Sequence, residues 1–288
     1  MFRRALGVLG LAVLLAAPVV LQAQGDYLDV YIAKVKPEKI GEFNAIAKKV
    51  IEANRRYNGD RWVAMETVYG EGDTFVFVSA RQDYAEAGKA YEVFLAALNK
   101  AYGKDAADKM MHDWENCLAA SRSELRLRRR DLSRKAPADA VAEAKLIGGS
   151  QVVRTIALHV RPGKVAEFEA LQREIKAARE RAANVQPVFV SQVIEGSKGA
   201  TFYISTFRSS MAGFDMNPTL RDTLGEEGYK KFQQVSAECI ESSESALYRF
   251  SPELSNPPEE FIAAAPEFWQ PKTGVASAAA RAKPKVPK

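Results

Sequence analysis

The hydrophobic and polar positions of the chain follow the same pattern twice. Tyr27–Val35 alternates as a half-buried strand does, and the segment from Pro37 spaces its apolar residues as an amphipathic helix does. Both patterns return around Pro162, with the apolar positions of the helix shifted by 125 residues. The matching sets are Ile40, Phe43, Ile46, Val50 and Ala53, and Val165, Phe168, Leu171, Ile175 and Ala178. The sequence therefore predicts an internal duplication.

The rest of each copy follows a common order of elements. After the first helix come two strands joined by a glycine-containing turn, then helical segments, then a last strand. The helical segment before the last strand is expected to reach Leu118 in the first copy. The predicted strands are Trp62–Tyr69, Thr74–Ala80 and Glu124–Arg130 in the first copy, and Val188–Glu195, Thr201–Phe207 and Ala246–Phe250 in the second.

The beginning of the chain differs from this repeated body. Residues 1–23 open with a basic stretch, continue with an apolar run from Ala5 to Leu21 and end on a small residue, which is typical of a cleaved secretory signal peptide. An uncleaved anchor is the alternative, but an apolar run of 17 residues that contains Pro18 is short for a membrane span. We therefore expect a periplasmic or secreted protein without stable membrane insertion.

The predicted domain boundaries follow from these patterns. Repeat 1 covers residues 24–133, and repeat 2 covers residues 150–255, with a linker rich in Ala, Lys and Asp at 134–149. Residues 256–271 carry aromatic side chains that predict an arm packed on the body. Residues 272–288, rich in Ala, Pro and Lys, predict a disordered basic tail.

The charge of the chain bears on nucleic-acid binding, and its two cysteines bear on disulfide formation. The chain has 41 Lys and Arg against 36 Asp and Glu, but the basic excess belongs to its two ends, and the body is slightly acidic. This balance gives no indication of a nucleic-acid partner. Cys117 and Cys239 occupy matching positions on the outer helices of opposed units, so a disulfide between them is not expected. Their apolar neighbours predict two buried free thiols.

The order strand, helix, strand, strand, helix, strand, with the motif V-K-P-x-x-x-x-E-F at the start of the first helix, resembles the dimeric α/β-barrel superfamily. That superfamily includes antibiotic-biosynthesis-monooxygenase-like and NIPSNAP-like domains. The resemblance implies an α+β fold in which two ferredoxin-like β-α-β-β-α-β repeats pair into an eight-stranded barrel. Because both repeats lie in one chain, the mature protein is expected to be a monomer with an intramolecular pseudo-dimer. The superfamily contains oxygenases, haem proteins and non-catalytic members, so the fold does not decide the activity.

The positions before Val35 and Val160 supply the first candidate site residues. If those two valines pack on the following helix, Lys34 and His159 point to the opposite face, which lines the interior of such a barrel. The alternative, which the sequence favours, is that both lie at strand ends and extend to water. The spacing of His, Cys and carboxylate residues predicts no metal site, and no cofactor is expected, although haem ligation by His159 stays open.

Other candidates lie on the later strands. Glu66 and Gln192 match between the copies, either as interior polar groups or, as the sequence favours, as polar residues of an edge strand. Tyr203 and Ser205 stand where the first copy has valines, which indicates a more polar second half. Residues 126–130 carry four arginines, which could bind an anion, although such a run more often forms a solvated strand end. In the second copy, Tyr248 occupies the position that corresponds to Arg126.

These patterns do not form a complete catalytic constellation. The sequence therefore favours an exported barrel that binds a small molecule or is not catalytic. One alternative is a cofactor-independent, monooxygenase-like enzyme that uses His159, Lys34 and Glu66. Another is a structural or protein-interaction module whose barrel interior is filled by its own side chains.

Overall fold

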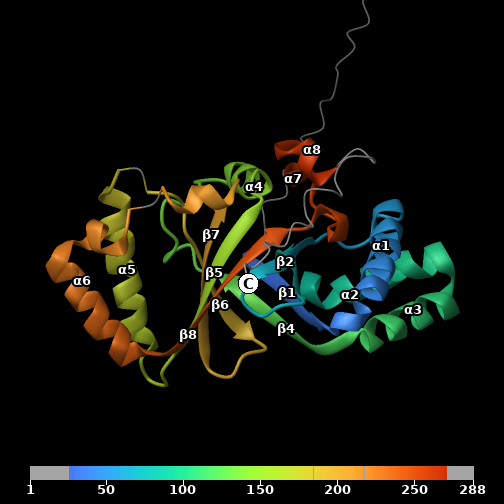
Figure 1. The fold of residues 1–288 in the computed structure, drawn as a ribbon, viewed down its shortest axis with the longest axis horizontal. Helices are drawn as coiled ribbons and strands as arrows, with labels where there is room; N and C mark the ends of the chain where they lie inside the picture. The colour runs from blue at the N-terminus through green and yellow to red at the C-terminus, as the bar shows by residue number, and fades with distance from the viewer. Residues whose placement is uncertain (1–25, 184, 217, 271–288) are drawn as a thin grey trace, which may run out of the picture.

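Eight antiparallel strands form one closed barrel at the centre of the molecule (Figure 1). The computed structural model describes residues 26–183, 185–216 and 218–270, so the predicted signal peptide and basic tail lie outside the described residues. Around the barrel the strands follow the order β1-β3-β2-β8-β5-β7-β6-β4. Their bounds are β1 (Tyr27–Val35), β2 (Val63–Tyr69), β3 (Thr74–Arg81), β4 (Leu118–Arg128), β5 (Val152–Val160), β6 (Phe189–Glu195), β7 (Ala200–Arg208) and β8 (Ile240–Phe250).

Helices cover the outside of the barrel on two sides and at one end (Figure 1). On the first half they are α1 (Ile40–Arg56), α2 (Tyr84–Tyr102) and α3 (Lys104–Asn116), and on the second α5 (Val165–Arg181) and α6 (Leu220–Cys239). At the end of the barrel lie α4 (Ala140–Gly148), α7 (Glu259–Ala264) and α8 (Pro266–Trp269). Single turns of 3-10 helix occupy Pro37–Lys39, Met211–Phe214 and Pro252–Leu254. Among the described helices, none is long and apolar enough to cross a bilayer.

The strand order is the same in the two halves of the barrel. Within the first half the order is β4-β1-β3-β2, and within the second it is β8-β5-β7-β6. The register also corresponds, because β1 and β3 pair Tyr27 with Arg81, while β5 and β7 pair Val152 with Arg208. The halves join along β2 and β8 and along β4 and β6. The predicted α+β class is confirmed, with barrel closure inside one chain.

The last strand of each half is longer than the sequence predicted. We expected strands from Glu124 and Ala246, yet β4 starts at Leu118 and β8 at Ile240. The expectation that the preceding helix reaches Leu118 is therefore wrong. The carbonyl oxygen of Cys117 accepts a hydrogen bond from the Lys36 backbone N–H at 2.9 Å, which ties this reversal to the end of β1.

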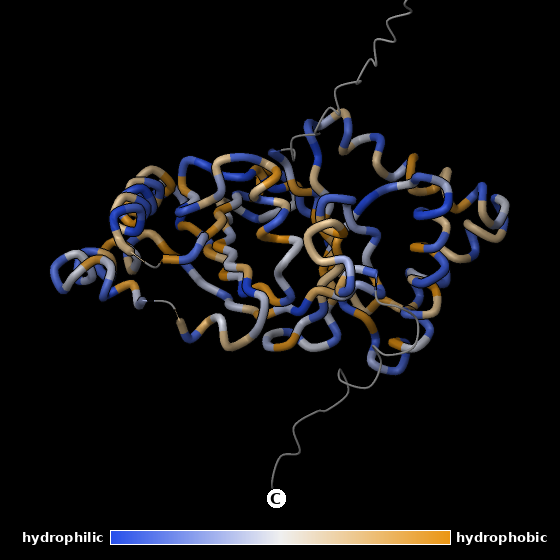
Figure 2. The backbone as a smooth tube through the Cα atoms, turned by 90° about the horizontal axis from the view of Figure 1, so that it is seen from above, coloured by the Kyte–Doolittle hydropathy of each residue, from blue (hydrophilic) through white to orange (hydrophobic). Residues whose placement is uncertain are grey.

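Each half of the barrel packs its outer face on its own helices. On the first half, Phe43 of α1 contacts Phe75 of β3 and Trp114 of α3, with ring centroids 5.0 and 4.3 Å apart. On the second half, Phe168 of α5 contacts Phe202 of β7 at 4.7 Å. Along the helices at both ends of Figure 2, hydrophilic and hydrophobic residues alternate, as amphipathic helices on a sheet require. The opposite strand faces line the barrel interior.

The segment expected to be a plain linker contains α4. Asp139 caps this helix by accepting a hydrogen bond from the Ala142 backbone N–H, which satisfies a donor of the first turn. The helix ends at Gly148, whose carbonyl oxygen accepts a hydrogen bond from the Trp269 indole at 2.7 Å. Phe261 of α7 packs beside Gly148 so closely that a β-carbon there would lie 2.8 Å from the Phe261 α-carbon. α4, α7 and α8 thus form one cap over the end of the barrel.

The two cysteines are free and buried, as the sequence predicted. Cys117 follows the last residue of α3, and Cys239 is the last residue of α6. Burial raises the pKa of both thiols, so both stay protonated and act as small apolar side chains.

Candidate functional site

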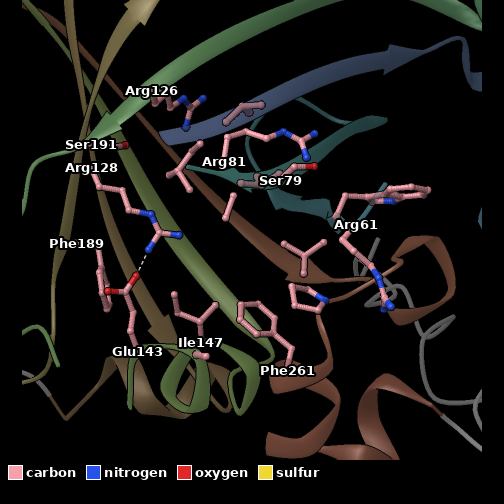
Figure 3. Close-up of a pocket in the computed structure, with 18 of the residues that line it drawn as sticks. Arg61, Ser79, Arg81, Arg126, Arg128, Glu143, Ile147, Phe189, Ser191 and Phe261 are labelled. Carbon is pink, nitrogen blue, oxygen red and sulfur yellow. Dashed lines mark hydrogen bonds and ion pairs between the residues drawn. The ribbon is translucent and has the colours of Figure 1, made fainter. Parts of the chain in front are cut away.

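A cavity of about 750 Å³ lies in the barrel beside the cap formed by α4, α7 and α8, and it extends to α2 on one side (Figure 3). Strand residues whose side chains alternate inward supply most of its walls. The apolar part of the lining includes Val30, Val63, Met65, Val78, Val153, Phe189, Phe207 and Phe250, and the cap adds Ala144, Ile147 and Phe261. The volume falls within the range of small-molecule sites, and walls of this kind bind apolar ligands.

Five arginines line this cavity, and Arg126 of β4 is a buried one, with 8% of its surface exposed. Of the others, Arg81 is paired with Asp29 and Asp60, and Arg128 and Arg130 are paired with Glu143. Arg126 Nε donates to Glu124 Oε2 at 2.8 Å, and Arg122 Nε donates to Glu124 Oε1 at 3.0 Å. The three side chains share a face because they alternate along one strand. Tyr203 of β7 donates its hydroxyl to Glu124 Oε1 at 3.2 Å. One buried carboxylate therefore serves two guanidinium groups, which leaves the cluster with a net positive charge.

The two phenols beside Arg126 stay protonated at neutral pH. Burial raises the pKa of Tyr203, and burial followed by the charge that Tyr203 would carry raises the pKa of Tyr248. The Arg126 guanidinium carbon lies 3.4 Å from the centroid of the Tyr203 ring, which is a cation–π contact. Both hydroxyls can therefore donate hydrogen bonds, and the stacked ring holds the guanidinium in place.

A second charged group joins the cap to the barrel. Glu143 of α4, 1% exposed, accepts hydrogen bonds from Arg128 Nη1 and, at 3.0 Å, from Arg130 Nη1 (Figure 3). Arg130 also pairs with Asp26 at 2.9 Å. A buried carboxylate held by two guanidinium groups is costly to separate from them. The end of β4 thereby fixes α4 across the cavity.

The structure brings four of the sequence candidates to one part of the barrel. Arg126 and Ser205 line the cavity, Tyr203 stacks on Arg126, and Tyr248 lies close enough to interact electrostatically with both Arg126 and Tyr203. The expectation that the arginine run forms a solvated strand end is wrong for Arg126, because alternation along β4 turns its side chain into the barrel.

The other four candidates lie outside the cavity lining. His159 Nδ1 is 3.1 Å from Thr201 Oγ1, and Lys34 forms an ion pair with Glu71 at 2.9 Å, both at strand ends. Glu66 is an exposed residue of β2. Gln192 accepts a hydrogen bond from Arg129 Nη1 at 2.7 Å.

Two important carboxylates of the site were not predicted. Glu124 was named only as the start of a strand, although its position two residues before Arg126 places both on one face. Glu143 lies in the segment expected to be linker, and no periodic signal in that segment indicates a contact with Arg128.

The donors around the cavity do not fit a metal or a haem. In the described parts of the chain, no group of three His, Cys, Asp or Glu residues is placed to hold a metal ion. The lining contains no histidine, cysteine or tyrosine that could act as an axial haem ligand, and His159 lies elsewhere. The chemistry that the cavity supports is recognition by guanidinium groups, hydroxyl groups and apolar walls.

Comparison with known proteins shows similarity in fold alone. No family model and no curated protein matches the chain. An anthrone oxidase-like protein superposes with a TM-score of 0.52 at 13% identity, over 79% of this chain and 92% of that chain. A monooxygenase-like protein from Lactobacillus acidophilus gives 0.46 at 10% identity, over 78% and 93% of the two chains. A mutant chlorite dismutase from Candidatus Nitrospira defluvii gives 0.47 at 9% identity, over 84% and 95%. At 13% identity, the superposition on the anthrone oxidase-like protein shows a shared fold and carries no information on activity.

Proposed function

We propose that this protein binds a small apolar molecule with one anionic group inside its barrel. The observation that carries the proposal is the cavity of about 750 Å³, with mostly apolar walls and the buried cation Arg126. Removal of apolar ligand surface from water supplies the main driving force. The guanidinium fixes the orientation, because a carboxylate or similar group can approach its cavity side.

The charge balance of the inner cluster favours an anion over a neutral ligand. Arg122 and Arg126 share the single carboxylate of Glu124. A ligand anion beside Arg126 would neutralise the remaining positive charge in a site shielded from water, where charge interactions are stronger than in solvent. Ser191 and Ser205 also line the cavity and can donate hydrogen bonds to the same group.

Binding accounts for the geometry better than the monooxygenase alternative does. That alternative relied on His159, Lys34 and Glu66 as polar groups, and none of these three lines the cavity. Among the carboxylates that line the cavity, Glu143 is engaged by Arg128 and Arg130, so it is a poor proton acceptor. Asp60 is likewise paired with Arg81 at 2.6 Å. The structural-module alternative expected a filled interior, which the cavity does not support.

We further propose that the chain is an exported, duplicated barrel that acts as a monomer. Equal strand order and equivalent pairing register in the two halves support two ferredoxin-like repeats. Pairing of β2 with β8 and of β4 with β6 leaves no open sheet edge for a second copy. Export rests on the sequence of residues 1–23.

Calorimetric titration with decanoate tests the binding proposal. We expect decanoate to bind and decanol to bind at least tenfold more weakly, because only decanoate offers an anion to Arg126. Val78→Trp places an indole ring in the cavity and should weaken decanoate binding, since Val78 is part of its wall. Val68→Trp is the matched control, because Val68 is exposed on β2 and its replacement should leave binding unchanged. Equal decanoate affinity in the two variants would overturn the proposal.

A further inference from the structure

Four arginines gather on the outside of the second half of the barrel. Arg154 of β5 and Arg208 of β7 lie on the sheet, Arg179 lies on α5, and Arg134 follows the end of β4. Val153 and Thr155 line the cavity, so Arg154 between them points to the outer face, away from the site described above. The positive charges of the four arginines lie close enough to repel one another. Arg179 repels Arg134, Arg154 repels Arg179, and both Arg154 and Arg179 repel Arg208.

No carboxylate compensates this cluster. Among the described residues, none of the four arginines forms an ion pair with an acidic side chain. The hydrogen bonds of Arg208 go to the carbonyl oxygens of Gly213, at 3.2 Å, and Phe207, at 2.6 Å. Arg134 donates to the side-chain oxygen of Gln172. Because these acceptors are neutral, they do not compensate the four positive charges of the cluster.

The first half of the barrel shows how the same position is normally balanced. Arg81 occupies the register position that Arg208 occupies in the second half, and Asp29 occupies that of Arg154. Arg81 is paired with Asp29 at 3.2 Å and with Asp60 at 2.6 Å. In the second half, an arginine therefore stands where the first half has the carboxylate partner.

Two of the arginines are buried and incompletely bonded. Arg134 is 4% exposed and Arg208 is 7% exposed. Arg134 Nε and Arg208 Nη2 are buried and have no hydrogen-bond partner within residues 26–183, 185–216 and 218–270. Burial, together with the charge of Arg179, lowers the pKa of Arg134 to about 10. Unpaired buried donors on charged groups are costly, and an anion that accepts their hydrogen bonds would remove that cost.

We propose that Arg134, Arg154, Arg179 and Arg208 form a second site that binds a phosphate group of a small molecule. A phosphate carries more than one negative charge and several acceptor oxygens, so it can serve several guanidinium groups at once. Arg154 is exposed and Arg179 is half-buried, which gives the anion access from solvent. Phe214 lies 5.5 Å from the guanidinium carbons of both Arg154 and Arg208 and holds them side by side.

Calorimetric titration with pyrophosphate at constant ionic strength tests this site in the full chain. We expect wild-type protein to bind pyrophosphate at least tenfold more tightly than acetate. Arg154→Asp restores the arrangement that Asp29 and Arg81 have in the first half, so it should reduce pyrophosphate affinity at least tenfold. Arg161→Asp makes the same change of charge on an exposed residue after β5 and should leave the affinity unchanged.

Melting temperatures measured without phosphate show whether the Arg154→Asp variant is folded. Arg154→Asp should melt at a higher temperature than wild-type protein, because it replaces repulsion with an ion pair. Equal loss of pyrophosphate binding in Arg154→Asp and Arg161→Asp, or no binding by wild-type protein, would overturn the site. Binding to vesicles of phosphatidylcholine with phosphatidic acid shows whether the phosphate group belongs to a lipid. Tighter binding to these vesicles than to pyrophosphate assigns the phosphate to a lipid headgroup. Weaker binding assigns it to a soluble phosphate ester. The decanoate titration is independent of these outcomes.

Discussion

The guanidinium of Arg126 lies over the ring of Tyr203, with 3.4 Å between its central carbon and the ring centroid. The two residues belong to β4 and β7, which are not paired with each other, so the contact spans the barrel interior. Because Tyr203 also donates its hydroxyl to Glu124, the ring fixes both charged groups of the cluster. The position of the cation therefore depends on the fold and not on a ligand.

Removal of the charges of Arg126 and Glu124 should separate charge recognition at the cavity wall from apolar binding. We expect the double variant Arg126→Gln with Glu124→Gln to lose about 10-fold to 100-fold in decanoate affinity, the range of a charged hydrogen bond. Decanol affinity should stay the same, since the apolar walls are intact. The double change avoids leaving Glu124 buried without its partner. An equal loss for decanol and decanoate would show that the variant damages the cavity.

The free energy of unfolding should respond oppositely to alanine at two helical glycines, Gly148 in the cap and Gly88 in α2. A β-carbon at Gly148 would lie 2.8 Å from the Phe261 α-carbon, whereas at Gly88 nothing lies within 4 Å. We expect Gly148→Ala to lower the free energy of unfolding by about 1–3 kcal/mol through overpacking. Gly88→Ala should raise it by about 0.5–1 kcal/mol because alanine favours the helix. Urea denaturation measures both, and a stabilising Gly148→Ala would show that α7 does not pack on α4.

Acid should weaken the junction that Arg129 makes between the barrel and α5. Hydrogen bonds from Arg129 lower the pKa of both Asp131 and Glu169 below their ordinary values of 3.8 and 4.5. A carboxyl whose folded pKa is lowered contributes stability above its unfolded pKa, and this stability is lost as pH falls through the folded value. Arg129→Met should therefore cost more unfolding free energy at pH 7 than at pH 3.

A matched variant controls for general effects of charge in that experiment. Arg221→Met removes an exposed arginine whose contact with Glu226 is 3.4 Å long. Its cost should be small and nearly independent of pH, because exposed pairs contribute little. A cost of Arg129→Met that is equal at pH 7 and pH 3 would contradict the assignment of both pKa shifts to Arg129.

The fold was predictable from the sequence to a greater extent than the site was. The offset between Phe43 and Phe168 correctly indicated two equivalent helices, because apolar spacing directly reflects which face packs on a sheet. Strand alternation also indicated that Arg126 shares a face with its neighbours two positions away. It could not show whether that face is exposed to solvent, since Arg126 is buried only when the closed barrel brings Tyr203 of β7 over it.

Contacts between distant segments account for most of what the sequence did not reveal. The ion pair between Arg128 and Glu143 requires α4 to lie across the barrel end, and no local pattern encodes that position. The same limit applies to Arg208 and Arg154, whose proximity follows from strand register. Register is set by the closed barrel as a whole.

The cysteines should be accessible only after unfolding. Both thiols are buried, and burial raises the pKa of each, so a thiol reagent should leave native protein unlabelled at pH 7. In denaturant without a reducing agent, mass spectrometry should show two labels per chain. Denatured protein that takes up no label would contradict the free state of Cys117 and Cys239.

The most direct test of the central claim is a crystal structure with 10-bromodecanoate, whose bromine can be located by anomalous scattering. We expect bromine inside the barrel cavity, among apolar residues such as Val78 and Phe250. We also expect a carboxylate oxygen within about 2.7–3.2 Å of an Arg126 nitrogen. Bromine located outside the barrel, or a carboxylate that turns away from Arg126 toward solvent, would contradict the account.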